Sequence, residues 1–127
     1  MNIPAELRYS REHEWVRVDG TTARLGITDF AQESLGDVVF VQLPEVGVEI
    51  IAGASAAEIE STKSVSDVYV PVSGVVTSVN EALVDAPELV NQDPYGAGWI
   101  LEVVLADVTE LDQLMDADAY RVVIGED

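Results

Sequence analysis

The feature that most constrains the fold is a succession of short apolar runs, each ended by turn residues. Residues 15–18, WVRV, alternate apolar and charged side chains, and residues 23–27, ARLGI, alternate in the same way after an Asp19-Gly20 turn. A period of two residues places successive side chains on opposite faces of a strand, so these runs predict a β-hairpin. The side chains expected to face inward are Val16, Val18, Ala23, Leu25 and Ile27. The repetition of such runs predicts a mainly β fold with short helical additions.

Further strands are predicted along the rest of the chain. Residues 38–43, VVFVQL, are apolar on both faces apart from Gln42, so we expect a strand buried at the centre of a sandwich. The other predicted strands, separated by Pro and Gly residues, are 48–51, 55–59, 67–70, 74–79 and 99–105. We expect a polar loop over residues 80–98. The side chains expected to share one face of the last strand are Leu101, Val103 and Leu105.

Two short helices are predicted. In the first, Asp29 is the expected N-cap with Gln32 three positions later, and Gly36 is the expected C-terminal stop. In the second, near the C-terminus, Thr109 is the expected N-cap. The apolar stripe of that helix consists of Leu111, Leu114 and Met115. We expect this stripe to pack on the core rather than to bind a partner.

Length and charge limit the classes of function. A chain of 127 residues with 48% hydrophobic content predicts one domain, 1–127, with a proper core. The net charge of -18 disfavours nucleic acid and membrane-surface partners, because both carry negative charge. The charge favours partners with basic docking faces, or it only keeps a small monomer soluble. Without cysteine, the chain has no thiolate nucleophile and no Cys-based zinc site.

The chain contains a single lysine, Lys63, in the polar segment ESTKS between two predicted strands. A lysine at a hairpin turn is exposed, and the small neighbours Ser61, Thr62 and Ser64 leave room for an approaching enzyme. Two interpretations follow: an ordinary solvated side chain, or an amine presented for covalent modification.

The segment ESTKSVSDVYVPVSGVV resembles the lipoyl-lysine region of the glycine cleavage system H protein. In the same order as in that family, the chain also contains HEWV, GITDFAQESLGDVVFVQLP, NEAL, LVNQDPYGAGW and ELDQLMDADAY. The resemblance extends from about Leu7 to Tyr120, which is the expected core of the domain, 7–120. Thr62 and Ser64 stand where the family often has Val and Ala, and both remain small.

The resemblance implies a hybrid barrel-sandwich of two antiparallel sheets and a non-catalytic carrier with lipoate attached to Lys63 through an amide. In the family, the arm receives an aminomethyl group from a pyridoxal-phosphate glycine decarboxylase. A tetrahydrofolate-dependent aminomethyltransferase then removes the one-carbon unit, and a flavin-containing dihydrolipoyl dehydrogenase reoxidises the dithiol. A lipoate-attaching enzyme is the fourth implied partner. Such a carrier needs no general acid or nucleophile of its own.

The resemblance also implies a surface cleft in which the loaded arm is held. Glu14 and Asp67 match family positions near that cleft, where each could pair with the cationic amine of the adduct. The alternative is that both are ordinary surface acids. His13, the only histidine, is expected to be a packed or capping residue rather than a catalytic one or a metal ligand.

Other functions fit the sequence less well. A lipoyl domain of a 2-oxoacid dehydrogenase is usually fused to a catalytic core through a mobile linker, and a biotin carrier is expected to have methionines beside its lysine. A Ser-His-Asp arrangement with turn context is not recognisable, and the acidic run 116–120 lacks the glycine and glutamate of a calcium loop. An H-like protein that mainly passes lipoyl groups to other complexes stays open as the alternative.

The first residues show neither a signal peptide nor a transit segment, and no run is long enough to span a membrane. We therefore expect a bacterial cytoplasmic protein, or a mitochondrial one if the sequence is a mature eukaryotic form.

Overall fold

The computed structural model describes residues 1–125, and Glu126 and Asp127, which end the predicted domain 1–127, lie outside the described residues. The strands are β1 (Arg8–Tyr9), β2 (Glu14–Asp19), β3 (Thr22–Ile27), β4 (Val38–Gln42), β5 (Glu49–Ile50), β6 (Ser55–Ser61), β7 (Val65–Tyr69), β8 (Gly74–Val79) and β9 (Leu101–Leu105). The helices are α1 (Asp29–Leu35), α2 (Ala82–Asp85), α3 (Leu89–Gln92), the 3-10 helix η1 (Val108–Gln113) and α4 (Ala117–Val123). Within residues 1–125, no helix is long and apolar enough to cross a bilayer.

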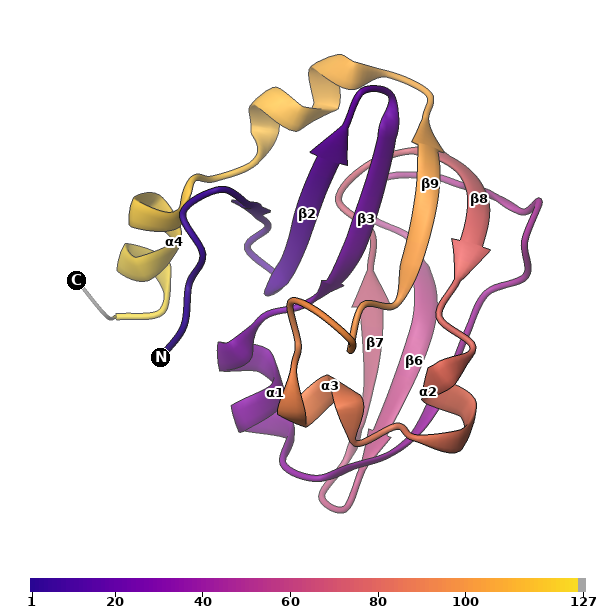
Figure 1. Cartoon of the computed structure of the whole chain (residues 1–127). Coiled ribbons are helices and arrows are strands. Elements are labelled where there is room, and N and C mark those ends of the chain that lie inside the picture. Colours follow the sequence, from indigo (N-terminus) through magenta and orange to yellow (C-terminus); the bar gives the residue numbers. More distant parts are fainter. Residues whose placement is uncertain (126–127) are drawn as a thin grey trace.

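The strands form two antiparallel sheets, which confirms the predicted mainly β class (Figure 1). The larger sheet has the order β1-β2-β3-β9-β8-β5, and the smaller sheet has the order β4-β6-β7. Buried side chains of both sheets, such as Leu25, Ile59 and Leu101, belong to one core cluster. The turn of the β6–β7 hairpin lies at the end of the molecule where α1, α2 and α3 are found (Figure 1). The β6–β7 hairpin is part of the smaller sheet, and the shared core packs it against the larger sheet.

The predicted hairpin of β2 and β3 is confirmed. Asp19 pairs with Thr22, and Gly20 adopts a φ of 64° in the turn, a conformation that glycine takes without steric cost. The inward-facing side chains of β3 are buried, namely Ala23, Leu25 and Ile27. The prediction that Val18 faces inward is wrong, since Val18 is 38% exposed. The last three residues of β2 are all exposed at the tip of the hairpin.

The prediction of a fully buried central strand at 38–43 is wrong. β4 lies at an edge of the smaller sheet, and its pairing with β6 is irregular between Val38 and Phe40. Val38 and Val41 face the core, whereas Val39 is 53% exposed and Phe40 is 49% exposed. An apolar residue at nearly every position therefore reflects an exposed apolar face here, not burial on two sides.

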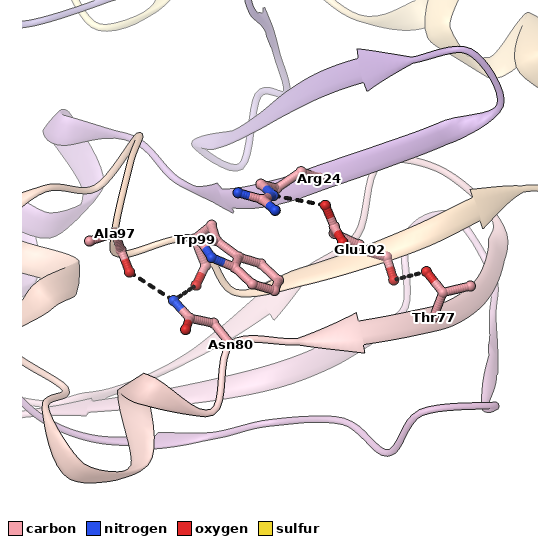
Figure 2. Close-up of polar contacts among 6 residues, drawn as sticks. All are labelled: Arg24, Thr77, Asn80, Ala97, Trp99 and Glu102. Atoms are coloured by element: carbon pink, nitrogen blue, oxygen red, sulfur yellow. Dashed lines mark hydrogen bonds and ion pairs between the residues drawn. The ribbon is translucent and has the colours of Figure 1, made fainter.

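The prediction of a polar loop over 80–98 is also wrong in part, since α2 and α3 lie within it. The segment is closed by Asn80, whose Nδ2 donates to the carbonyl oxygens of Ala97 at 2.7 Å and Trp99 at 2.8 Å (Figure 2). The Arg24 guanidinium lies 4.3 Å from the Trp99 ring and pairs with Glu102 at 2.8 Å. These contacts fix the end of the segment to β3 and β9.

The predicted N-cap of the first helix is shifted by one residue. Thr28, in extended backbone, accepts a hydrogen bond from the Ala31 N–H at 3.2 Å, so it caps α1. Asp29 is the first helical residue and accepts from the Gln32 side chain at 2.7 Å. The predicted stop at Gly36 is confirmed, with a φ of 81°.

The C-terminal helix also differs from the prediction, both in its N-cap and in its division into two parts. It is divided into η1 and α4, and Asp107, not Thr109, caps η1 by accepting from the Thr109 N–H at 3.0 Å. Asp116 caps α4 by accepting from the Ala119 N–H at 2.8 Å. The predicted apolar stripe does pack inward: Leu111 and Leu114 lie against the main core and Met115 against a second cluster.

The second cluster holds the C-terminal helix on β1 and β2. The Tyr9 and Tyr120 rings stack with centroids 4.8 Å apart, and both side chains are fully buried. Trp15 and Tyr95 belong to the same cluster. Stacked and tilted aromatic rings of this kind add to the stabilisation that buried area alone provides. The cluster therefore fixes α4 beside the residues that precede β2.

Candidate functional site

Lys63 lies in the turn between β6 and β7 and is exposed, as the sequence predicts. The Ser61 hydroxyl organises this turn, because it accepts from the backbone N–H groups of Lys63 and Ser64, each at 3.1 Å. The Thr62 N–H donates to the Asp37 carbonyl at 3.0 Å and so ties the turn to the residue before β4. The small hydroxyl residues therefore hold the backbone while the lysine projects outward.

The stem of Lys63 passes over the C-terminus of α1. A Cβ placed on Gly36 would lie 3.1 Å from Lys63 Cε and 3.7 Å from its Nζ. Gly36 is thus favoured by its backbone conformation, and the Lys63 stem packs closely against it.

Beside the hairpin lies a cleft with a volume of about 340 Å³. One wall is the segment that precedes and begins β2, a second wall is α1, and a third is β7 with its turn. The polar side chains of the cleft are Glu12, His13, Glu14, Ser34, Ser64, Ser66 and Asp67, and its apolar side chains are Ile27, Phe30, Ala31, Leu35, Ile59, Val65 and Val68. The cleft can hold a partly apolar, flexible group whose end is polar.

Glu14 is one of the most deeply buried polar side chains in the described residues, with 2% of its surface exposed. Its Oε1 accepts a hydrogen bond of 2.6 Å from the Ser10 hydroxyl, which in turn accepts from the Glu14 N–H at 3.0 Å. Burial raises the pKa of Glu14 to about 8, although the Ser10 hydroxyl and the Tyr69 N–H oppose the shift. The cleft therefore contains a carboxyl group that is largely protonated at neutral pH.

Asp67 also lines the cleft, but it is exposed at the rim. Its Oδ1 accepts from the Ser55 hydroxyl at 3.1 Å, and Tyr69 lies with its hydroxyl 3.5 Å from Oδ2. The structure thus brings together Glu14 and Asp67, which are 53 positions apart in the sequence, on one cleft next to Lys63. Glu14 is not the ordinary surface acid of the alternative interpretation.

His13 is a packed residue, in agreement with the prediction. Its Nδ1 lies 2.8 Å from the Tyr120 hydroxyl, and its ring centroid lies 4.8 Å from that of Phe30. Burial lowers the pKa of His13, which keeps the imidazole neutral at pH 7. Its backbone has a φ of 72°, an uncommon conformation for a residue other than glycine.

Comparison with known proteins identifies the family of the chain. The model of the family described as glycine cleavage H-protein matches residues 7–127. The chain belongs to the glycine cleavage H-protein family.

The relatives of the chain carry the same family name. The glycine cleavage system H protein of Mycobacterium avium is 59% identical over 98% of each chain, and that of Anoxybacillus flavithermus is 53% identical over 100% of each. The crystal structure of a glycine cleavage system H protein from Mycobacterium marinum matches with a TM-score of 0.89 and 46% identity. It covers 97% of this chain and 99% of that one.

Family membership settles the class of function. An H protein is the lipoyl-bearing carrier of the glycine cleavage system and is not a catalyst, so its activity implies contact with the other enzymes of the system. The expected barrel-sandwich fold is confirmed, because the similar solved structure is an H protein. Function mainly as a lipoyl relay for other complexes is not favoured.

Several residues of this H-protein cleft could not be predicted as a group. Glu12, Phe30 and Ser34 reach the cleft from the segment before β2 and from α1, and no common spacing links them. The one available signal is local: Ser10 and Glu14 are four positions apart in a segment that returns on itself, where the Ser10 N–H donates to the Glu14 carbonyl at 2.9 Å.

The described part of this H protein contains no group of three or more His, Cys, Asp or Glu side chains that could hold a metal ion. In the acidic run 116–120, Asp116 is used as the N-cap of α4, and Tyr120 is buried. The run therefore has a structural use.

Proposed function

We propose that this protein carries lipoate on Lys63, through an amide between the lipoyl carboxyl group and Nζ. The observation that carries the proposal is the position of the chain's single lysine, which is exposed at the hairpin turn directly beside the cleft. The other amine of the chain is its N-terminus, whose neighbour Asn2 donates its N–H to Asp29 at 2.9 Å, away from the hairpin. Attachment at Lys63 places the arm where it can either enter the cleft or reach out to a partner.

The loaded arm rests in the cleft, with the aminomethyl group near Glu14 and Asp67. The apolar walls of the cleft suit the hydrocarbon part of the arm, and the two carboxyl groups suit its cationic amine. Since burial keeps Glu14 largely protonated at neutral pH, an arriving cationic amine favours loss of that proton. Glu14 thus remains uncharged until a cation is present, which avoids the cost of an unpaired buried charge.

The arm serves three enzymes in turn: the pyridoxal-phosphate glycine decarboxylase, the tetrahydrofolate-dependent aminomethyltransferase and the flavin-containing dihydrolipoyl dehydrogenase. A separate enzyme attaches the lipoate. Tethering raises the local concentration of the intermediate at each active site, so the carrier needs no catalytic group. We further propose that the carrier acts as a monomer in the bacterial cytoplasm, in keeping with its bacterial relatives.

Reconstitution tests this function. The lipoylated protein is mixed with the glycine decarboxylase of its own organism, and the exchange of labelled bicarbonate into the carboxyl group of glycine is measured. The lipoylated wild type should support exchange, whereas Lys63→Arg, which keeps the charge but has no acylable amine, should not. Lack of exchange by fully lipoylated wild type would contradict the glycine-cleavage function and would favour the lipoyl-relay alternative.

A further inference from the structure

We infer that Tyr120, in the C-terminal helix, is a positioning residue that holds two walls of the cleft together and so sets how long a loaded arm stays protected. The inference rests on the proposed function, because it concerns the arm that the cleft is proposed to hold. Tyr120 is not one of the residues that line the cleft, so it acts through residues that do.

The central observation is that one phenol oxygen joins both walls. The Tyr120 hydroxyl lies 2.7 Å from Thr28 Oγ1 and 2.8 Å from His13 Nδ1. Tyr120 is fully buried, and its ring is fixed by stacking on Tyr9 with centroids 4.8 Å apart. A rigid ring therefore presents its oxygen to two groups that come from different parts of the chain.

Each of these groups belongs to a wall of the cleft. Thr28 is the N-cap of α1, the helix that contributes Phe30, Ser34 and Leu35 to the cleft. His13 is itself a cleft residue and precedes Glu14 directly. The Tyr120 oxygen is thus the point where the wall that carries Glu14 is linked to the wall formed by α1.

A backbone hydrogen bond and a ring contact connect the same two walls. The Thr28 N–H donates to the His13 carbonyl at 3.0 Å, and the His13 ring lies 4.8 Å from Phe30. His13 holds a φ of 72°, a conformation that persists only where surrounding contacts enforce it. The imidazole bond to Tyr120 is one of these contacts, so its loss favours rearrangement of the segment before β2.

The chemical consequence concerns water. The aminomethyl group on the sulfur of the arm is hydrolysed when water attacks its carbon: the C–N and C–S bonds break, and one water, with the protonated adduct, gives formaldehyde, ammonium and the free thiol. The carbon keeps its oxidation state, so no redox partner is needed. A cleft that opens more often admits water more often, and the adduct is lost faster.

The test uses the full-length lipoylated protein and the variant Tyr120→Phe, which keeps the stacked ring and removes only the oxygen. The decarboxylase and glycine are used to attach the aminomethyl group to the arm of each protein, and the decarboxylase is then removed. Mass spectrometry follows the loss of the aminomethylated protein over time, and the formaldehyde released is measured in parallel. Loss of the two neutral hydrogen bonds, to Thr28 and to His13, should raise the decay rate by about thirtyfold through the opening equilibrium.

Two comparisons separate positioning from a general loss of stability. Ile50→Val truncates a buried residue on β5, the edge of the larger sheet opposite to β1, and should decay at the wild-type rate even where its melting temperature falls as far as that of Tyr120→Phe. Thr28→Ser keeps the hydroxyl that meets Tyr120 and caps α1, so it should retain protection, whereas Thr28→Val loses both contacts and should lose protection.

The outcomes distinguish this inference from the proposed function. Decay of Tyr120→Phe at the wild-type rate, with a protected wild type, overturns the positioning role and leaves the carrier function intact. Equal acceleration by Ile50→Val, or equal decay of Thr28→Ser and Thr28→Val, also overturns it. A wild-type adduct that decays as fast as aminomethyl-dihydrolipoamide free in solution rejects the protective cleft itself, and the inference is rejected with it.

Discussion

At the scale of single residues, Glu14 is the group whose chemistry depends most on its surroundings. Glu14 is 2% exposed, its carboxyl group accepts from a serine hydroxyl, and no cationic side chain lines the cleft around it in the described residues. Burial without a counter-charge favours the neutral acid, which explains the raised pKa. A buried acid of this kind is largely protonated at neutral pH, and the proposed function has it pair with the cationic amine of the arm.

The raised pKa predicts how stability depends on pH. Glu14 ionises near pH 4.5 in the unfolded chain and near pH 8 in the folded one, so the folded state binds more protons between these values. The Glu14 contribution to the unfolding free energy is therefore fully present below pH 4.5 and is lost as the pH rises towards 8, by at most a few kcal/mol. Urea denaturation of Glu14→Gln should show a flatter decline of the unfolding free energy than the wild type over this range.

The control for this prediction is Glu45→Gln, which changes an exposed carboxyl group outside the cleft. It should keep the wild-type pH dependence. The same pH dependence in Glu14→Gln and in the wild type would mean that the pKa of Glu14 is not raised in the folded protein.

At the scale of elements, the junction between α1 and the Lys63 hairpin depends on Gly36. Its φ of 81° and ψ of -158° lie in a region that is essentially restricted to glycine. Gly36→Ala should therefore lower the unfolding free energy by about 1–3 kcal/mol in urea denaturation. The added methyl group would also lie 3.1 Å from Lys63 Cε, so the exposed lysine side chain shifts slightly to make room.

Ser34→Ala is the matched control for Gly36→Ala, since it changes an exposed position of α1 to a better helix former. It should change the unfolding free energy by less than about 0.5 kcal/mol. A Gly36→Ala variant as stable as Ser34→Ala would show that the end of α1 tolerates a different backbone path.

The elements also show which parts of the fold the sequence could predict. Period-two alternation located the β2–β3 hairpin and the inward face of β9, because one buried face dictates that pattern. The cap residues were each missed by one or two positions, since Thr28 beside Asp29 and Asp107 near Thr109 are equally able to accept. Only the backbone path decides which of two nearby oxygens meets the free N–H.

Other elements were missed for different physical reasons. An apolar pattern on both faces indicated a central strand, but β4 keeps Val39 and Phe40 in contact with solvent at a sheet edge. α2 and α3 contain four residues each, which is too short for a helical period to appear in the sequence. The buried state of Glu14 depends on Ser10 and β7, which meet it only in the folded chain.

At the scale of the whole molecule, the net charge of -18 predicts attraction to partners with basic docking faces. Long-range attraction to basic docking faces speeds association and is screened by salt. On the proposed function, the KM of the dihydrolipoyl dehydrogenase for the reduced, dihydrolipoyl form of the carrier should therefore rise several-fold between about 50 mM and about 500 mM NaCl.

Free dihydrolipoamide, a neutral counterpart of the arm, supplies the control in the same assay. Its KM should change little with salt, because screening acts on the charged carrier rather than on the reacting dithiol. A carrier KM that is as insensitive to salt as that of dihydrolipoamide would show that the acidic surface serves only solubility.

Attachment of lipoate to Lys63 is decided by intact and peptide mass analysis of the protein isolated from its own host. We expect a single added lipoyl amide, on the peptide that contains Lys63, and no addition at the N-terminus. An unmodified Lys63 in cells that synthesise and attach lipoate would contradict the carrier function, because the cleft beside the lysine would then have no arm to hold.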